Sequence, residues 1–227
     1  MDERVSQARL LYQRAVFSGE AGPLAEAGRQ LDAAEADLAV ARGRLLHTRL
    51  VLRREQDPAA AEEDPGELEL FERAAGLYRA LGNPRGEGEA LFWLGCFHQV
   101  ARRDNATAVP VLERALELAS QAGDTDVMSE ALRHLGIAAY AAGRLDAARQ
   151  RLEESTRLRR ETGFLPGAAA NLVGLAYIAA AQQRRDDALA LLDEASAIAE
   201  ASNAHRILLQ VSQARAELPD QHGHQPA

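Results

Sequence analysis

The only cysteine of this sequence, Cys96, and the nearby His98 are the first candidates for chemistry. A thiol becomes a nucleophile when a neighbouring base or positive charge lowers its pKa. No His or Asp lies one helical turn from Cys96, so nothing on the same helix would activate it. We interpret Cys96 as a small packing residue, with a reactive thiol as the alternative. We interpret His98 as a packed, hydrogen-bonded residue rather than a catalytic base.

Other residue pairs that suggest chemistry have simpler explanations. His222-Gly223-His224 resembles a loose metal-binding pair but lies in a polar C-terminal tail, where we interpret it as incidental. The adjacent acids Glu153-Glu154 and Asp186-Asp187 lie on outward faces of expected helices and are typical of solvated charge. The sequence contains no Walker motif, no dinucleotide fingerprint and no Gly-x-Ser-x-Gly. We therefore predict no catalytic residue, no metal ligand and no cofactor.

The composition favours a helical protein. Aromatic residues make up only 4% of the 227 residues, and the strong helix formers Ala, Leu, Glu and Arg dominate. The net charge of -8 argues against nucleic-acid binding. We expect no membrane association, because no apolar stretch approaches the roughly 20 residues that a bilayer span needs. A polar N-terminus without a secretory signal and a single cysteine predict a cytoplasmic protein.

Apolar or small residues recur at helical spacing in three copies that are displaced by 40 residues. Each copy ends at a residue that tolerates the left-handed conformation of a helix C-cap. Five matched positions in three copies indicate a structural repeat. The copies are Ala108, Leu112, Ala115, Leu118 and Gly123, then Ala148, Leu152, Ser155, Leu158 and Gly163, then Ala188, Leu192, Ala195, Ile198 and Asn203.

A second set of matched residues precedes each copy and defines the other helix of a pair. Its small members are Gly95, Gly136 and Ala176, which we expect where two helices approach closely. The spacing from Gly95 to Gly136 is 41, so one extra residue precedes Ala108. We place it in the polar stretch 102–105. A step of 41 back from the first copy predicts an earlier second helix with Phe71, Ala74, Leu77 and Gly82.

These motifs resemble the tetratricopeptide repeat, whose usual period is about 34 residues. The pattern is clear over residues 85–203 and weaker over 2–82, where Gly43 fits the small position of a first helix. The long period resembles the sensor arms of large bacterial regulators and the kinesin light chain. The resemblance implies an all-α fold, namely an α-solenoid of antiparallel helix pairs in a right-handed superhelix with a C-terminal capping helix. The residues that match the family pattern are Leu132, Leu135-Gly136, Gly143, Leu145, Ala148 and Leu152.

The expected organisation is one repeat domain over residues 1–218 followed by a disordered tail over 219–227. Residues 2–18 form a first helix. Residues 24–35 and 37–55 form either two helices, with a break near Ala36-Asp37, or one continuous helix. We expect a mobile acidic loop over 57–66 and a last helix over about 204–217, which would cap the solenoid.

The resemblance also implies a concave groove lined by the first helix of each pair. Polar groove positions suit an acidic or C-terminal peptide, or a small carboxylate. The absence of Lys from the sequence argues against the carboxylate clamp of the chaperone-binding subfamily. Trp93 falls between neighbouring helices, which predicts core packing. The predicted groove residues are Arg44, His47, Phe92, Cys96, Gln99, Arg133, Ile137, Tyr140 and Tyr177.

We therefore predict a scaffold or adaptor that binds a protein or peptide partner, with a homodimer through the exposed end faces as the alternative within this class. The alternative is a stand-alone regulatory module that senses a small acidic molecule or peptide. An enzyme is the third hypothesis. It is ranked last because no set of residues points to a reaction.

Overall fold

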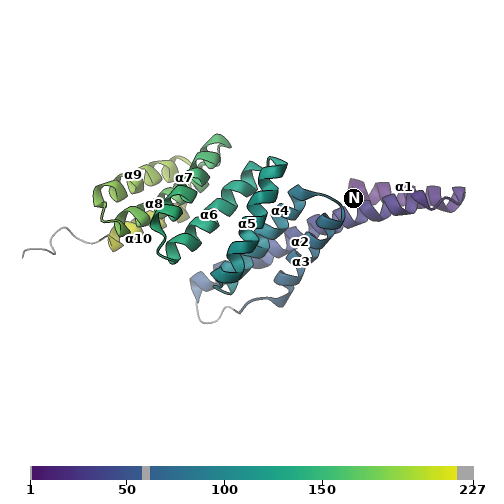
Figure 1. Ribbon diagram of the computed structural model, residues 1–227, viewed down its shortest axis with the longest axis horizontal. Coiled ribbons are helices and arrows are strands. Elements are labelled where there is room, and N and C mark those ends of the chain that lie inside the picture. Colours follow the sequence, from purple (N-terminus) through teal and green to yellow (C-terminus); the bar gives the residue numbers. More distant parts are fainter. Residues whose placement is uncertain (1, 58–61, 219–227) are drawn as a thin grey trace, which may run out of the picture. The chain divides into compact units, whose positions relative to one another are not determined.

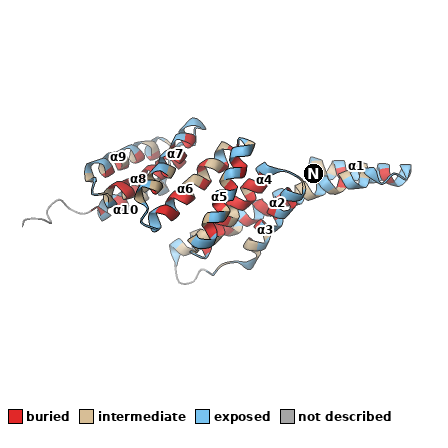
Figure 2. Ribbon diagram, viewed as in Figure 1, coloured by how far each residue is buried: buried red, intermediate tan, exposed pale blue. Residues whose placement is uncertain are grey.

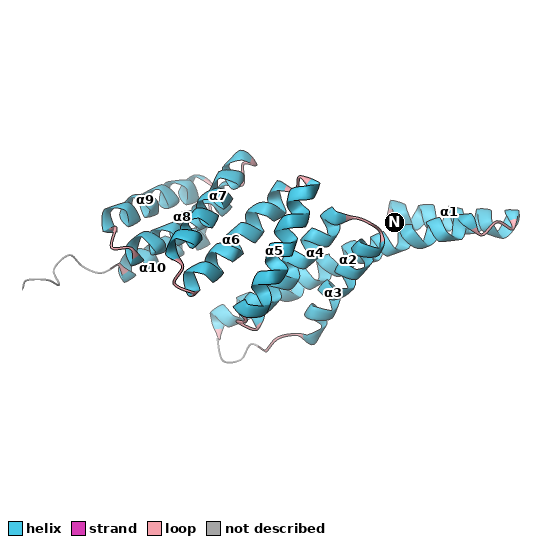
Figure 3. Ribbon diagram, viewed as in Figure 1, coloured by secondary structure: helices cyan, strands magenta, loops and turns pink. Residues whose placement is uncertain are grey.

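A computed structural model describes residues 2–57 and 62–218 of the chain. Among these residues the regular secondary structure is helical, and no strand is present (Figure 3). The helices are α1 (Glu3–Ser18), α2 (Gly22–Gln56), α3 (Pro65–Ala80), α4 (Pro84–Cys96), the π-helix η1 (Phe97–Ala101), α5 (Asn105–Ala122), α6 (Thr125–Ala141), α7 (Leu145–Glu161), α8 (Leu165–Ala181), α9 (Arg185–Ala201) and α10 (His205–Glu217).

The chain divides into two compact units, residues 1–127 and residues 128–227, and each is described by itself. In the first unit, each helix from α1 to α5 packs on the next one in sequence (Figure 1). In the second unit, α7 to α10 do the same, and most of α6 belongs to this unit. Helices packed in successive pairs confirm the predicted all-α solenoid. A single repeat domain over residues 1–218 stays a prediction.

The residues that close each copy of the repeat in the sequence adopt the left-handed conformation at the ends of the helices. Gly123, Gly163 and Asn203 follow the second helices and have φ of 65°, 73° and 54°. Arg103 and Gln183 have φ of 55° and 60°, and each occupies the turn inside a helix pair. A left-handed residue reverses the chain sharply after a helix, and Gly and Asn adopt this conformation more easily than other residues.

Small residues let the helices of each unit approach closely. A Cβ on Gly95 would lie 2.6 Å from Leu112 Cδ2, and one on Gly136 would lie 3.0 Å from Leu152 Cγ. A Cβ on Gly43 would lie 2.5 Å from Phe71 Cε1. Phe71 is the predicted counterpart of Leu112, so Gly43 holds the small position of its pair, as the sequence predicted.

The N-terminal region contains one long helix rather than two. Residues 22–56 form the continuous helix α2, so the break near Ala36-Asp37 is absent. No Pro follows Pro23 within this segment, and Ala36 is fully buried inside the helical run. The N-terminal half of α2 pairs with α1, and the remainder packs on α3 and α4.

The extra residue of the repeat lies in a π-helical turn. Helix η1 runs from Phe97 to Ala101 directly after α4, and a π-turn adds one residue to an α-helix. Arg103 then takes the left-handed position that Gly143 takes in the next pair. Residues 102–105 are therefore already back in register, and the prediction that they carry the insertion is wrong.

The guanidinium of Arg54 stabilises this turn. From the last turn of α2 it donates hydrogen bonds to the carbonyl oxygens of Val100 and Ala101, the latter at 2.7 Å. A π-turn leaves carbonyl groups without the usual helical donors, so a charged donor from a neighbouring helix compensates for them.

The buried residues, which are red in Figure 2, are mostly alanine and leucine. In the second unit the core includes Ala148, Leu152, Ala188 and Leu192, with Val211 of α10 completing it. The predicted last helix is confirmed as α10. The tail 219–227 and residues 58–61 of the expected loop 57–66 lie outside the described residues. Residues 62–64 are not helical, and α3 begins at Pro65, so the last two residues of the expected loop belong to this helix.

Changing Gly95 to Ala tests the close contact of α4 with α5. The added Cβ meets buried Leu112, so we expect a loss of about 1–3 kcal/mol in the free energy of unfolding. Gly76→Ala in α3 is the control, because a Cβ there meets nothing within 4 Å. It should stabilise the chain by about 0.5–1 kcal/mol through helix propensity. Urea denaturation followed by circular dichroism measures both, and equal effects would contradict the packing argument.

Changing Arg54 to Ala tests the support of the π-turn. We expect a loss of about 2 kcal/mol, because two carbonyl groups lose a charged donor. Hydrogen exchange should become faster first at residues 97–101. The neighbouring exposed Arg53→Ala should change stability by less than about 0.5 kcal/mol. Unchanged exchange at these amides would mean that the turn does not depend on Arg54.

Candidate functional site

The predicted groove residues fall into two groups, one in each compact unit. The first unit contains Arg44, His47, Phe92, Cys96 and Gln99. The second contains Arg133 and Ile137 of α6 together with Tyr140 and Tyr177.

In the first unit, Arg44 is exposed and lies over an aromatic ring. Its guanidinium carbon is 5.1 Å from the centre of the Trp93 ring, and Nη1 is 3.4 Å from Glu89 Oε1. The Trp93 ring stacks at 6.1 Å on Phe71 and packs against the buried cluster around it. Trp93 is therefore a packing residue, as predicted, and it also supports the Arg44 side chain.

Three predicted groove residues of the first unit are buried. His47 is 7% exposed, and its Nδ1 lies 2.7 Å from Oε1 of the fully buried Glu67. Phe92 and Cys96 are 4% and 1% exposed. These depths do not allow direct contact with a partner, because the side chains pack against helices of their own unit. Of this group Arg44 and Gln99 retain accessible surface, and Gln99 donates a hydrogen bond to Asn105 Oδ1 at 3.0 Å.

His98 packs beside the π-turn rather than in a catalytic arrangement. Its ring lies edge-on to Phe97 at 5.5 Å, as a packed residue should. The predicted hydrogen bond to its ring is absent at Nδ1, which is buried without a partner among the described residues. Burial and the charge of Arg102 lower the pKa of His98 below its usual value.

The second unit contains a buried polar network that begins at Arg133. Nη1 of Arg133 donates to Asn171 Oδ1 at 2.8 Å, and Nη1 of Arg159 approaches the same oxygen at 3.3 Å. Arg159, which is 2% exposed, also donates to the carbonyl oxygen of Gly167 at 2.9 Å and pairs with Glu130 Oε2 at 2.6 Å. Two guanidinium groups from α6 and α7 therefore share one acceptor on α8.

Asn171 and Ser155 connect this network to the backbone of α6 through hydrogen bonds. Its Nδ2 donates to Ser155 Oγ at 2.8 Å, and Ser155 donates to the carbonyl oxygen of Ser129 at 2.6 Å. Asn171 and Ser155 are fully buried. These bonds fix the orientation of the Asn171 amide, with its oxygen towards the two arginines.

The charges of this network do not balance. Among the contacts of the described residues, the only carboxylate paired with either guanidinium group is that of Glu130, which pairs with Arg159 and has a side chain that is 33% exposed. Burial and the charge of Arg159 lower the pKa of Arg133 to about 10, while Glu130 opposes this shift. Burial also lowers the pKa of Arg159. A further negative charge near Arg133 would relieve the repulsion between the arginines.

Sequence reasoning missed three members of this network, although the repeat contains a signal for them. Arg159 aligns with Ala119 and Ala199, which are both fully buried. Ser155 likewise aligns with buried Ala115 and Ala195, and Asn171 aligns with buried Ala131. A polar residue where the other copies bury Ala is the feature to look for.

Exposed apolar side chains lie beside Arg133 on the same helix. Ile137 and Tyr140 follow it by one and two helical turns and are 38% and 39% exposed. Tyr177, which occupies the position of Ile137 on α8, donates its hydroxyl to Glu217 Oε2 at 3.0 Å. The face of α6 and α8 thus combines a cation with aliphatic and aromatic surface.

Metal-binding and membrane-spanning features are absent from residues 2–57 and 62–218. No cluster of three or more His, Cys, Asp or Glu residues there has metal-binding geometry. No helix of this part is long and apolar enough to cross a membrane. The pair His222-Gly223-His224 lies outside the described residues.

Comparison with known proteins agrees with the geometry. Residues 90–161 match the family model of the tetratricopeptide repeat. A crystal structure of nearly identical TPR-like repeats, from a Podosopora anserina protein assigned as a kinesin light chain, matches with a TM-score of 0.53 and 18% identity, covering 78% of this chain and 97% of that chain. A variant of the same repeats with one substitution matches with a TM-score of 0.52 and 17% identity, covering 78% and 94%. No curated protein matches the sequence. The predicted resemblance to these repeats is confirmed at the level of the fold.

Changing Glu130 to Gln tests the charge imbalance. It removes the carboxylate that pairs with Arg159 and that offsets part of the charge of Arg133, and we expect a loss of about 1–3 kcal/mol in the free energy of unfolding. The loss should shrink in a background with Arg133→Leu, where one buried charge is removed. Glu153→Gln is the control, because Glu153 forms an exposed pair with Arg149 at 3.5 Å. Additive effects of the two changes would show that Glu130 does not compensate the charge of Arg133.

Proposed function

We propose that this tetratricopeptide-repeat chain is a protein-interaction scaffold whose α6–α8 face binds a carboxylate-bearing segment of a partner protein. Repeats of this family support protein interaction in general. The finer proposal rests on one observation: Arg133 and Arg159 share the Asn171 oxygen beside exposed Ile137 and Tyr140, and among the described residues only Arg159 of the two pairs with a carboxylate.

The energetics of the network favour a binding role. A buried ionic network adds little stability compared with apolar packing of similar volume. At three positions this unit has a polar residue where other copies bury Ala, so it gives up simple packing. In exchange, the guanidinium of Arg133 becomes rigid, because its Nη1 is hydrogen-bonded to Asn171 and Asn171 is hydrogen-bonded to Ser155. A side chain fixed in this way loses little entropy when it binds a ligand.

The chemistry of the surface indicates the kind of partner. Arginine binds carboxylates through two parallel hydrogen bonds, which suits an acidic side chain or a C-terminal carboxylate. Ile137, Tyr140 and Tyr177 offer apolar contact on the same face, and aromatic residues commonly anchor protein interfaces. We therefore expect an acidic residue followed or preceded by apolar residues in the bound segment. In the first unit, we propose Arg44 and Gln99 as the accessible members of the predicted groove.

The test uses an array of short peptides that contain Asp or Glu next to apolar residues, each paired with its Asn or Gln analogue. We expect the acidic peptides to bind at least tenfold more tightly than the amides, because only a carboxylate compensates Arg133. Arg133→Glu should abolish this preference, and Tyr140→Ala should weaken binding several-fold. Arg206→Glu on α10 is the control with the same charge change and should bind normally.

Two outcomes would contradict the proposal. Acidic and amide peptides could bind equally, or Arg133→Glu could bind as the wild type does. Free glutarate provides a further arm. If glutarate binds as tightly as the peptides, the ligand is a small acidic molecule and the sensing alternative holds instead.

A further inference from the structure

Helix α2 exposes a row of leucines at intervals of seven residues. They are between 47% and 59% exposed, and each lies almost directly above the last along the helix. Leucine at this interval is typical of a coiled-coil seam, and an apolar row of this length marks an interaction surface. The leucines are Leu24, Leu31, Leu38, Leu45 and Leu52.

Helix α1 adds apolar residues to the same surface. Val5, Tyr12 and Val16 are 39%, 58% and 56% exposed. At 100° per residue they lie about a quarter turn from the buried Ala8 and Ala15, which face α2. The leucines of α2 are likewise rotated by about a quarter turn from the side of α2 that faces α1. The direction of rotation, followed from the N-terminus to the C-terminus of each helix, is the same in both helices. Because the two helices are antiparallel, both rows fall on one side of the hairpin.

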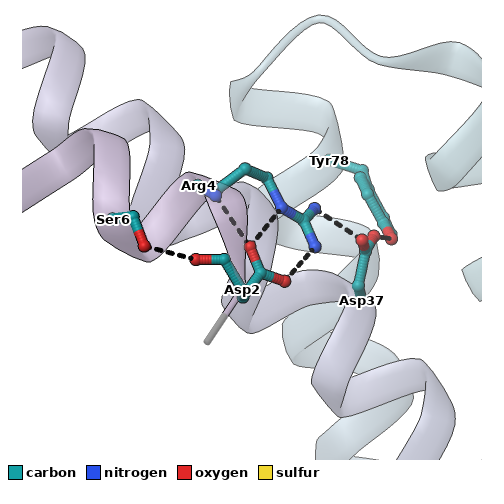
Figure 4. Close-up of polar contacts among 5 residues, drawn as sticks. All are labelled: Asp2, Arg4, Ser6, Asp37 and Tyr78. Carbon is teal, nitrogen blue, oxygen red and sulfur yellow. Dashed lines mark hydrogen bonds and ion pairs between the residues drawn. The ribbon is translucent and has the colours of Figure 1, made fainter.

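The packing of the described helices within the first unit leaves this surface uncovered. The buried residues Val40, Gly43, His47 and Leu50 place α3 and α4 against the opposite side of α2. Helix α1 accompanies only the N-terminal half of α2, because it begins opposite Asp37. Figure 4 shows the contact that fixes this end.

In that contact, the guanidinium of Arg4 lies between Asp2 and Asp37, and the hydroxyl of Tyr78 also bonds to Asp37. Ser6 donates to the backbone oxygen of Asp2 and closes the first turn of α1. Beyond Asp37 the leucine row continues past the start of α1 to Leu52, so no described helix of this unit accompanies the second half of the row.

We propose that this surface pairs with α2 of a second copy of the chain, antiparallel and about a two-fold axis at Leu38. The axis places Leu31 against Leu45 of the second copy and Leu24 against Leu52 of the second copy. Each α1 would then lie beside the uncovered half of the other α2, giving a bundle of four helices. The seam from Leu24 to Leu52 is about 42 Å long at 1.5 Å per residue.

The charges of α2 favour this antiparallel arrangement. Its first half is mainly acidic, and the second half has five arginines with no acid before Glu55. An antiparallel pair brings Glu35 of each copy next to Arg42 of the other, and the contact occurs twice by symmetry. A parallel pair would align arginine with arginine. The acids of the first half are Glu26, Asp32, Glu35 and Asp37, and the arginines of the second half are Arg42, Arg44, Arg49, Arg53 and Arg54.

The charged side chains beside the leucine row are exposed enough to pair with a second copy. Glu35 already pairs with Arg73 at 2.9 Å, yet 49% of its side chain is exposed. Arg42 and Arg49 are exposed. A straight helix drifts by about 20° per heptad relative to such a seam, so the two α2 helices would wind around each other with a left-handed twist.

The test measures the mass of the full chain by light scattering and sedimentation over a range of concentrations. We expect the wild type to be a dimer and Leu38→Glu to be a monomer with unchanged helix content. At the two-fold axis this change brings two carboxylates together, and it should raise the dissociation constant at least 100-fold. Leu209→Glu, at a 72% exposed leucine of α10, is the control and should remain a dimer.

Charge exchange and crosslinking test the orientation. Glu35→Arg and Arg42→Glu should each weaken the dimer about tenfold or more, and the double exchange should restore it. Leu38→Cys should form an interchain disulfide in mild oxidant, whereas Leu24→Cys should not, because its neighbour in the second copy is Leu52. A wild type that is monomeric at all concentrations, or a Leu38→Glu dimer, overturns the proposal. Disulfide formation by Leu24→Cys overturns the antiparallel arrangement.

Discussion

The close approach of paired helices at a glycine is the constraint on which the rest of this structure depends. At Gly43, Gly95 and Gly136 the missing side chain is replaced by Phe71, Leu112 and Leu152 from the next helix. Interiors are packed so closely that an extra methyl group at such a contact must displace its neighbour. Each contact therefore fixes how far along one helix the next helix lies.

This constraint explains why the extra residue of the repeat is found in a π-turn. Gly95 must meet Leu112, and Arg103 must reverse the chain between them. Neither position can shift by one residue without losing a contact or a cap. The extra residue is accommodated between these two positions by the π-helical turn η1. Arg54 donates hydrogen bonds to carbonyl groups that this wider turn leaves without a helical donor. From the sequence alone, polar residues 102–105 were the natural place for an insertion, because a loop tolerates extra length more easily than a helix.

The same register predicted much of the fold but less of the site. It identified the left-handed residues Gly123, Gly163 and Asn203 and the small residue Gly43, because those positions are determined by local geometry. Side-chain exposure depends instead on what the neighbouring helices contribute. Phe92 and Ile137 were both assigned to the groove, yet the first is 4% and the second 38% exposed. The continuity of α2 was also open in the sequence, since a helix without Pro or Gly at the expected break can either continue or turn.

The two proposed surfaces belong to different units and would reinforce each other. The α6–α8 face offers one rigid guanidinium and a few apolar contacts, which on its own supports only modest affinity. A pair of chains joined through α2 presents this face twice. A partner with two acidic segments, or a partner that is itself oligomeric, would bind the second face at an effective concentration that reaches the millimolar range when the spacing allows it. Tight binding would then come from the number of faces rather than from the strength of each one. Dimerisation would thus connect two features, a hydrophobic row that no described helix of its own unit covers and a binding face with few anchors.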